Sequence, residues 1–434
     1  MRRIALRASP CLSDDDPRDD PFQYGEIQAK GYARQVRWFR RRAESSKPDA
    51  MTDAAEDRRR RALALSTEGR HEEAVALLGP VAEAPTAGPA DLLILGLVLS
   101  NAGKAREAAQ VLFRGTRRFP QAAALHENLG VLLIALGGFP QAVTALTRAL
   151  ETGADNPNIH DGLCTCFAEL GDLEAARRHG VAALEAKDRQ ARESGPVHPL
   201  PEPPPPFDPT TPGRNLIAFS LWGDKELYCQ GALRNARLIP ELYPGWTARF
   251  YCDETVPEAL RAALAGEGAE VVLRPRPQRL YEGLLWRFEP VGDPAVARFL
   301  VRDADSLVSV QERVAVDAWL ASGRHFHVMR DWPTHTDLIL AGLWGGVGGV
   351  LPPVAELVRD FTPFRAANLH FDQDLLRIVA WPTVRQSVLI HDSYFDCLGS
   401  EPFPALGRLP PGWRVGQTWT GRQVKAEEPI DRRR

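Results

Sequence analysis

The sequence of 434 residues predicts two architectures in succession: a solenoid of helix pairs, and then an α/β domain with a mostly parallel sheet. Three observations carry this prediction. The first part of the chain repeats with a period of 34 residues, a proline-rich stretch follows it, and strand-like and helix-like segments alternate beyond that stretch. Such alternation is typical of α/β folds, in which helices cover the sheet.

The repeat is marked by glycines that lie 34 residues apart and by an alanine five residues after each of them. The glycines are Gly69, Gly103, Gly137 and Gly171, and the alanines are Ala74, Ala108, Ala142 and Ala176. This period resembles that of the tetratricopeptide repeat, a helix pair that stacks on its neighbours. We expect the glycines at turns with positive φ and the alanines where helices approach closely. The array is predicted over residues 55–190.

Arrays of this kind resemble protein-interaction platforms with a concave groove for a peptide. The array therefore predicts a protein or peptide partner. A purely structural array that packs on the neighbouring domain or mediates self-association is an equal alternative, because no groove residue identifies a ligand.

The composition narrows the class of protein. Hydrophobic residues make up 44% and charged residues 25%, as in globular proteins. The net charge of −3 argues against a nucleic-acid binder. Six scattered cysteines predict no disulfide framework and a cytoplasmic location. No apolar run is long enough for a transmembrane segment. Residues 1–50 are predicted to be a flexible leader, with Met51 as an alternative start.

Prolines crowd residues 195–213 and predict a semi-rigid spacer between two domains, with a polyproline ligand as the alternative. The α/β domain is then expected over residues 214–434. Strands are expected at 216–221, 248–252, 269–273, 296–301, 325–329 and 338–343, and helices at 227–242, 257–264 and 310–321.

The apolar run that begins at Phe299 ends in two carboxylates, Asp303 and Asp305, one residue apart. Open α/β sheets bind ligands at the carboxyl ends of such strands. Two oxygens of this kind suit Mg²⁺ or Mn²⁺ shared with a diphosphate. Three interpretations compete: the metal-binding DxD of a nucleotide-sugar glycosyltransferase, a phosphoryl-transfer aspartate of the haloacid-dehalogenase type, and a helix cap. A dehalogenase motif normally follows the first strand of its domain, and this pair comes well after it.

The order of several blocks resembles the GT-A class of glycosyltransferases over roughly residues 214–400. The blocks are Phe219-Ser220-Leu221-Trp222-Gly223, Phe250-Tyr251-Cys252-Asp253, Leu285-Trp286-Arg287-Phe288, Arg302-Asp303-Ala304-Asp305-Ser306, Ala341-Gly342-Leu343-Trp344-Gly345-Gly346 and His370-Phe371-Asp372-Gln373-Asp374. The resemblance implies that Asp305 holds the metal directly, and that Asp303 holds the ribose, the sugar or a metal-bound water. It also makes His391 a candidate third metal ligand, for which a histidine that binds no metal is the alternative.

The same resemblance implies a donor pocket. Its candidate residues are Ser220, Trp222, Asp253, Arg287, Asp303, Arg330 and Gly342. A turn cap is the alternative for Asp253, and a surface salt bridge for Arg287. A catalytic carboxylate is needed only if the anomeric centre is inverted, and the candidates are Asp372, Asp374 and Asp331. N-capping is the alternative for each of them.

The sequence thus predicts a metal-dependent glycosyltransferase that uses a nucleotide-diphospho-sugar and an acceptor recruited by the array. The competing hypothesis is a non-catalytic scaffold with a degenerate GT-A-like domain. Neither the donor base and sugar, nor the acceptor, nor retention or inversion follows from these residues.

Overall fold

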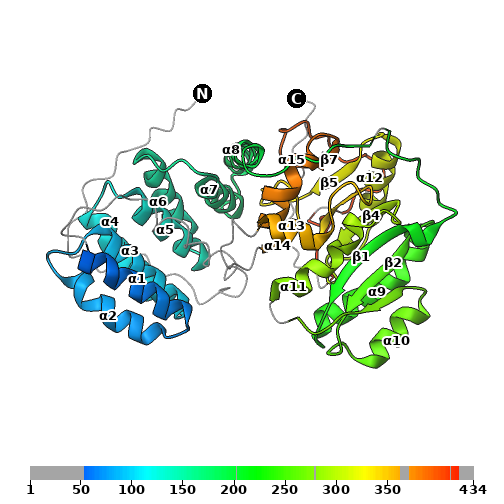
Figure 1. The fold of residues 1–434 in the computed structure, drawn as a ribbon. Coiled ribbons are helices and arrows are strands. Elements are labelled where there is room, and N and C mark those ends of the chain that lie inside the picture. Colours follow the sequence, from blue (N-terminus) through cyan, green and yellow to red (C-terminus); the bar gives the residue numbers. More distant parts are fainter. Residues whose placement is uncertain (1–52, 202, 278–279, 362–370, 411, 420–434) are drawn as a thin grey trace, which may run out of the picture. The chain divides into compact units, whose positions relative to one another are not determined.

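A computed structural model describes residues 53–419, apart from 202, 278–279, 362–370 and 411. It contains helix-pair repeats followed by a mixed α/β domain, which confirms the predicted fold class (Figure 1). The predicted leader at 1–50 lies outside the described residues. In the described part of the chain, no helix combines the length and apolar character needed to cross a membrane.

Eight consecutive helices form the repeats, and each pair corresponds to one 34-residue period. They are α1 (Asp53–Thr67), α2 (His71–Glu83), α3 (Pro89–Asn101), α4 (Ala105–Arg118), α5 (Ala123–Ala135), α6 (Phe139–Glu151), α7 (Pro157–Glu169) and α8 (Leu173–Arg192). The four turn glycines have φ angles of 82°, 79°, 78° and 81°. The four alanines are all buried. Both expectations about the repeat are therefore confirmed, because a positive φ favours glycine at the turns and close helix packing favours a small residue at the buried positions.

The chain divides into two compact units within α6, after Ala145. The last helix pair, α7–α8, therefore belongs to the same unit as the α/β domain. One apolar cluster joins Cys164 of α7 and Leu184 of α8 to Trp381 and Phe395. This division differs from the boundary predicted at 195–213, because α7 and α8 pack on the α/β domain.

The proline-rich segment contains no helix or strand among its described residues from 195 to 211, as a spacer would. It is nevertheless attached to the α/β domain. The amide of His198 donates to Oγ1 of Thr383 over 2.9 Å. Nε2 of His325 lies 2.6 Å from the carbonyl oxygen of Pro201. These hydrogen bonds therefore fix the segment against the α/β domain. We call residues 195–211 the proline-rich strap.

The α/β domain contains a seven-stranded sheet in the order β3-β2-β1-β4-β6-β5-β7. The strands are β1 (Asn215–Leu221), β2 (Thr247–Cys252), β3 (Glu270–Leu273), β4 (Arg298–Arg302), β5 (Phe326–Arg330), β6 (Leu343–Gly346) and β7 (Val388–Asp392). Only β6 runs antiparallel to its neighbours, β4 and β5. The longer helices are α9 (Glu226–Leu242), α10 (Glu258–Gly266), α12 (Val310–Ala321) and α13 (Val354–Phe361).

The strand predicted at 338–343 is wrong in its bounds, because β6 begins only at Leu343. Leu338 and Ile339 are buried, but they belong to a loop that packs into the core. A short apolar run cannot by itself distinguish a strand from a buried loop. The strand contains Gly345 and Gly346, where a side chain would collide with β4 and β5.

The strand order creates a switch point between β1 and β4. The chain leaves β1 toward β2 and β3 on one side, and β4 then pairs with β1 on the other side. Ligands bind in the crevice at the carboxyl ends of strands at such a point. Ser220 of β1 and Asp303 after β4 lie at these ends.

Candidate donor and metal site

The turn that carries the two aspartates is held by α9. Asn235, which is fully buried, donates to the carbonyl of Ser306 over 2.8 Å and accepts from the amide of Val308 over 3.0 Å. Gly231 contacts the same turn so closely that a β-carbon there would overlap the carbonyl of Ala304. Asp303 and Asp305 are both partly exposed at the end of β4. The turn is therefore fixed while its carboxylates remain accessible.

Arg287 connects the DxD turn with the segment after residue 370. It lies in the 3-10 helix η4 (Trp286–Gly292) and is 5% exposed. Its guanidinium forms one ion pair with Asp303 and another with Asp372, the second at 3.0 Å. Its amide also donates to the hydroxyl of Ser220 over 3.0 Å. The surface salt bridge considered for Arg287 is thus not what the structure shows.

The charge of Arg287 is stabilised by these partners. Burial lowers the pKa of the guanidinium, but the adjacent carboxylates of Asp303 and Asp372 outweigh burial and raise the pKa. The Nε atom of Arg287 is buried and has no hydrogen-bond partner among the described residues. Of the five N–H donors of this arginine, the one on Nε is therefore unused beside two carboxylates.

Gly342 also borders Asp303. A β-carbon at this position would overlap Oδ2 of the Asp303 carboxylate. The loop between β5 and β6 therefore approaches the DxD turn through a residue that has no side chain. Gly342 is a predicted residue of the donor pocket, and its contact with a donor remains a proposal.

Asp253 stabilises the loops that follow β1 and β2. Its Oδ1 accepts from the amide of Thr255 over 3.0 Å and also from the Thr255 hydroxyl. That hydroxyl in turn accepts from the amide of Gly223 over 2.7 Å. The structure thus places Asp253 in the turn-cap role considered for it. Nearby, the rings of Trp222 and Trp286 meet edge to face at 6.1 Å.

Arg330 lies in the interior, which differs from its expected place in a donor pocket. It forms an ion pair with Asp392 at 2.6 Å, and both side chains are fully buried. The sequence could not reveal this pair, because its partners are 62 residues apart.

Asp331 is likewise committed to contacts within the domain. Its Oδ2 accepts from Gln311 over 3.1 Å and from the amide of Val415 over 2.9 Å, and its Oδ1 accepts from Ser393. Burial raises the pKa of Asp331. The carboxylate therefore attaches the C-terminal segment to the domain and is not directed at an open site.

Asp372 and Asp374 are at the start of the next helical segment. They lie in α14 (Phe371–Leu375), which continues as the π-helix η6 (Leu376–Ala380). Asp372 accepts from Arg287 and, over 2.9 Å, from the amide of Gln373. Asp374 forms an ion pair with Arg377. Arg287 therefore bridges Asp372 and Asp303, whereas Asp374 pairs with Arg377.

His391 does not join the two aspartates. Its Nδ1 lies 2.8 Å from Nε2 of His327, and burial lowers the pKa of His391 to about 4. Within the ranges that the structure describes, no group of three or more His, Cys, Asp or Glu side chains is arranged to hold a metal. A metal at this site would therefore rely on Asp303 and Asp305 and on oxygens of its substrate. Two accessible carboxylates one residue apart fit that use.

The C-terminal segment was not expected at the site. The amide of Trp419 donates to the carbonyl of Asp305 over 3.1 Å, and Ser306 donates to the carbonyl of Gly416 over 2.9 Å. The guanidinium of Arg234 lies 4.6 Å from the centroid of the Trp419 ring. These contacts join residues more than 100 positions apart, so no local pattern could predict them.

The fold and this site define a protein with helical repeats and an α/β domain that has an acidic site at its switch point.

No protein-family model and no curated protein sequence matches the chain. Solved structures show a distant likeness. A structure of MamA from MSR-1 is 22% identical, covers 31% of this chain and 78% of its own, and has a TM-score of 0.28. A mutant O-GlcNAc transferase from Thermobaculum terrenum is 21% identical, covers 55% of this chain and 44% of its own, and has a TM-score of 0.33. Similarity at this level says nothing about activity.

Proposed function

We propose that the α/β domain is a metal-dependent GT-A-like glycosyltransferase that transfers a sugar from a nucleotide-diphospho-sugar to an acceptor. The observation that carries the proposal is the pair of accessible carboxylates, Asp303 and Asp305, at the switch point of the sheet. This is the place where α/β sheets bind nucleotides. The resemblance of the sequence blocks to GT-A enzymes supports the same assignment.

Each residue of the candidate site has a separate proposed role. Asp303 and Asp305 would hold Mg²⁺ or Mn²⁺, which offsets the charge that develops on a leaving diphosphate. Arg287 orients Asp303 and Asp372 through its two ion pairs. Ser220, in β1, and Trp222, directly after it, would border the nucleotide. Because Asp372 is paired with Arg287, it is better suited to bind a sugar hydroxyl than to accept a proton.

The helical array would recruit a protein or peptide acceptor, in the cytoplasm. The alternative remains a scaffold whose α/β domain binds without turnover. The presence of both aspartates of the DxD turn, each partly exposed, supports the enzyme.

Calorimetric titration of UDP-, GDP-, ADP- and CDP-sugars with and without Mn²⁺ tests the proposal. We expect one donor to bind only with Mn²⁺, and Asp305→Ala to abolish that binding. Asp317→Ala is the matched control, because Asp317 is an exposed aspartate on α12 that forms an ion pair with Arg313. Binding of no donor by the wild-type protein would contradict the proposal and favour the scaffold. Donor binding that Asp305→Ala leaves intact would contradict the assigned site.

A further inference from the structure

Two adjacent residues of α8, Lys187 and Asp188, hold the two chain segments that border the candidate site. One segment is the loop 331–342 between β5 and β6, which ends at Gly342 beside Asp303. The other is the helical segment 371–384, which contains Asp372 as its second residue. Both contacts lie within one compact unit of the protein.

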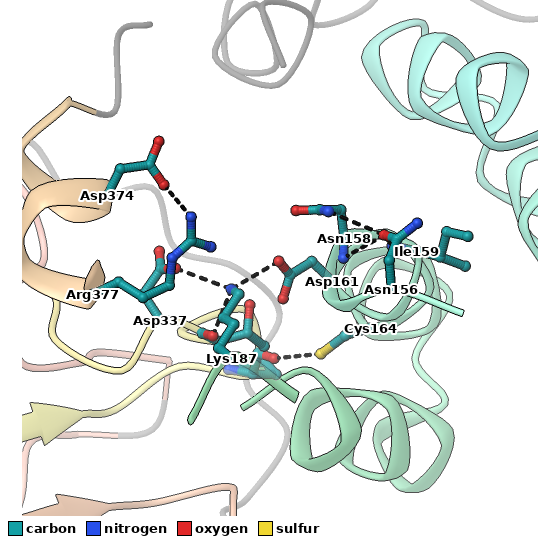
Figure 2. A network of polar contacts seen from close by, with 11 residues as sticks. Asn156, Asn158, Ile159, Asp161, Cys164, Lys187, Asp337, Asp374 and Arg377 are labelled. Carbon is teal, nitrogen blue, oxygen red and sulfur yellow. Dashed lines mark hydrogen bonds and ion pairs between the residues drawn. The ribbon is translucent and has the colours of Figure 1, made fainter. Parts of the chain in front are cut away.

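Lys187 holds the loop. Its side chain is 3% exposed, and Nζ donates to the carbonyl of Thr336 over 2.8 Å. The same nitrogen forms ion pairs with Asp337 at 3.0 Å and with Asp161 of α7 at 2.8 Å (Figure 2). Three acceptors thus match the three donors of the ammonium group. The sulfur of Cys164 adds a contact to the carbonyl of Pro333 at 3.0 Å.

Asp188 holds the helical segment. Its Oδ1 accepts from the indole of Trp381 over 2.8 Å and from Arg385 over 3.0 Å. Trp381 begins α15 (Trp381–Val384) directly after the π-helix η6. Figure 2 shows the Asp374–Arg377 pair of this segment on the side that faces Lys187. The loop and the helical segment are therefore both attached to the same turn of α8.

The loop is the more direct link to the site. It has no helix or strand between Asp331 and Gly342, so its path depends on side-chain contacts. Lys187 fixes its middle at residues 336 and 337, and Gly342 must stay close to Asp303. Gly342 lies five positions after Asp337, and Leu338 and Ile339 between them pack into the core, so a shift at residue 337 would reach Gly342 by displacing these two buried side chains.

We propose that Lys187 is a positioning residue of the transferase site, through which the last helix pair sets the distance between Gly342 and Asp303. The inference rests on the proposed function of that site. The last repeat is then a component of the site as well as the end of an array. A change at α7 that displaces Asp161 from Lys187 would alter the site without touching the donor.

The test compares Lys187→Met, which removes the charge, with Lys187→Arg, which keeps it. The matched control is Arg177→Met, because Arg177 also connects α8 to the α/β domain, through Asp396 at 3.7 Å. Hydrogen exchange is measured at residues 303–306 and 338–343. Steady-state hydrolysis or transfer is measured with Mn²⁺ and the nucleotide sugar selected by the titration above.

We expect Lys187→Met to speed exchange about tenfold in both segments and to lower kcat about tenfold with KM changed less than about threefold. Lys187→Arg should restore most of the protection from exchange and most of kcat. Arg177→Met should change neither the exchange rates nor kcat. Faster exchange confined to α7, α8 and residues 333–337 would overturn the proposal, as would equal losses with Arg177→Met. If Lys187→Met does not fold, Asp161→Asn takes its place. Its exchange rates and kcat are then compared with those of Arg177→Met, and the same outcomes support or overturn the proposal.

Failure of this inference can be distinguished from failure of the proposed function. A wild-type protein without turnover or donor binding would contradict the transferase, while exchange at 303–306 would still show whether Lys187 controls the DxD turn. A transferase whose kcat and exchange at 303–306 are insensitive to Lys187→Met would overturn only the positioning role.

Discussion

The two oxygens of the Asp303 carboxylate have different neighbours: Oδ1 is paired with Arg287, and Oδ2 faces the bare α-carbon of Gly342. The orientation of this carboxylate is therefore set by a cation on one oxygen and by a missing side chain at the other. Because the Asp303 side chain is still 47% exposed, it can bind a ligand without moving far.

Replacing Gly342 by alanine should disturb the site more than the fold. The added β-carbon would overlap Asp303, so the carboxylate or the loop must shift. We expect Mn²⁺-dependent donor affinity to fall at least about tenfold and stability to fall by about 1–3 kcal/mol. Calorimetry and urea unfolding measure the two effects. Gly266→Ala is the control, since a β-carbon at Gly266 has no neighbour within 4 Å. Unchanged donor affinity in Gly342→Ala would contradict the prediction.

Replacing Arg287 by methionine should destabilise the α/β domain. The substitution removes the Arg287 guanidinium from Asp372, which is 6% exposed. We expect the free energy of unfolding in urea to fall by about 3 kcal/mol. This value is at the lower end of the range for breaking a buried ion pair, because water can reach Asp303. The exposed pair Arg237–Glu267 supplies the control, and Arg237→Met should cost less than about 1 kcal/mol. Equal losses in the two variants would show that Arg287 contributes no more than a surface pair.

Stability should decline as the pH falls from about 6.5 to about 4. Burial lowers the pKa of His391 to about 4 and the pKa of His327 well below its usual value. The unfolded chain takes up protons in this range and the folded chain does not, so acid favours unfolding. At about 1.4 kcal/mol per pH unit, His391 alone contributes roughly 3 kcal/mol. His179 and His335, with pKa values lowered to about 4 and about 3, act in the same direction.

Urea unfolding at a series of pH values measures this dependence. The double variant His327→Leu/His391→Leu removes both members of the pair, so its stability should decline less steeply between pH 6.5 and 4. Parallel curves for the variant and the wild-type protein would assign the effect to other groups.

The α/β domain should need α7 and α8 to be stable. A fragment of residues 153–434 keeps Lys187, Asp188 and the apolar contacts of α8, whereas a fragment of residues 195–434 loses them. Both fragments keep the proline-rich strap. We expect the shorter fragment to be less stable by at least about 3 kcal/mol, since it exposes apolar core and leaves buried polar groups without partners. Identical thermal unfolding of the two fragments would contradict this prediction.

Local patterns in the sequence predicted local structure well. Residues 310–321 form α12, and the turn glycines have the expected positive φ. The position of Asp303 at the end of β4 also follows from the run that precedes it. Pairing across long separations was not predictable. Nothing near Arg330 in the sequence indicates that it pairs with Asp392, and nothing near Lys187 indicates that it reaches Asp337.

The attachment of α8 to the α/β domain also limits how this protein can change by recombination. Domain boundaries often fall in proline-rich linkers. Here a crossover at 195–213 would separate Lys187 and Asp188 from their partners. A crossover upstream of Leu146 would leave those contacts intact. Relatives of this protein should therefore vary in the number of their early repeats while inheriting the last repeat together with the α/β domain.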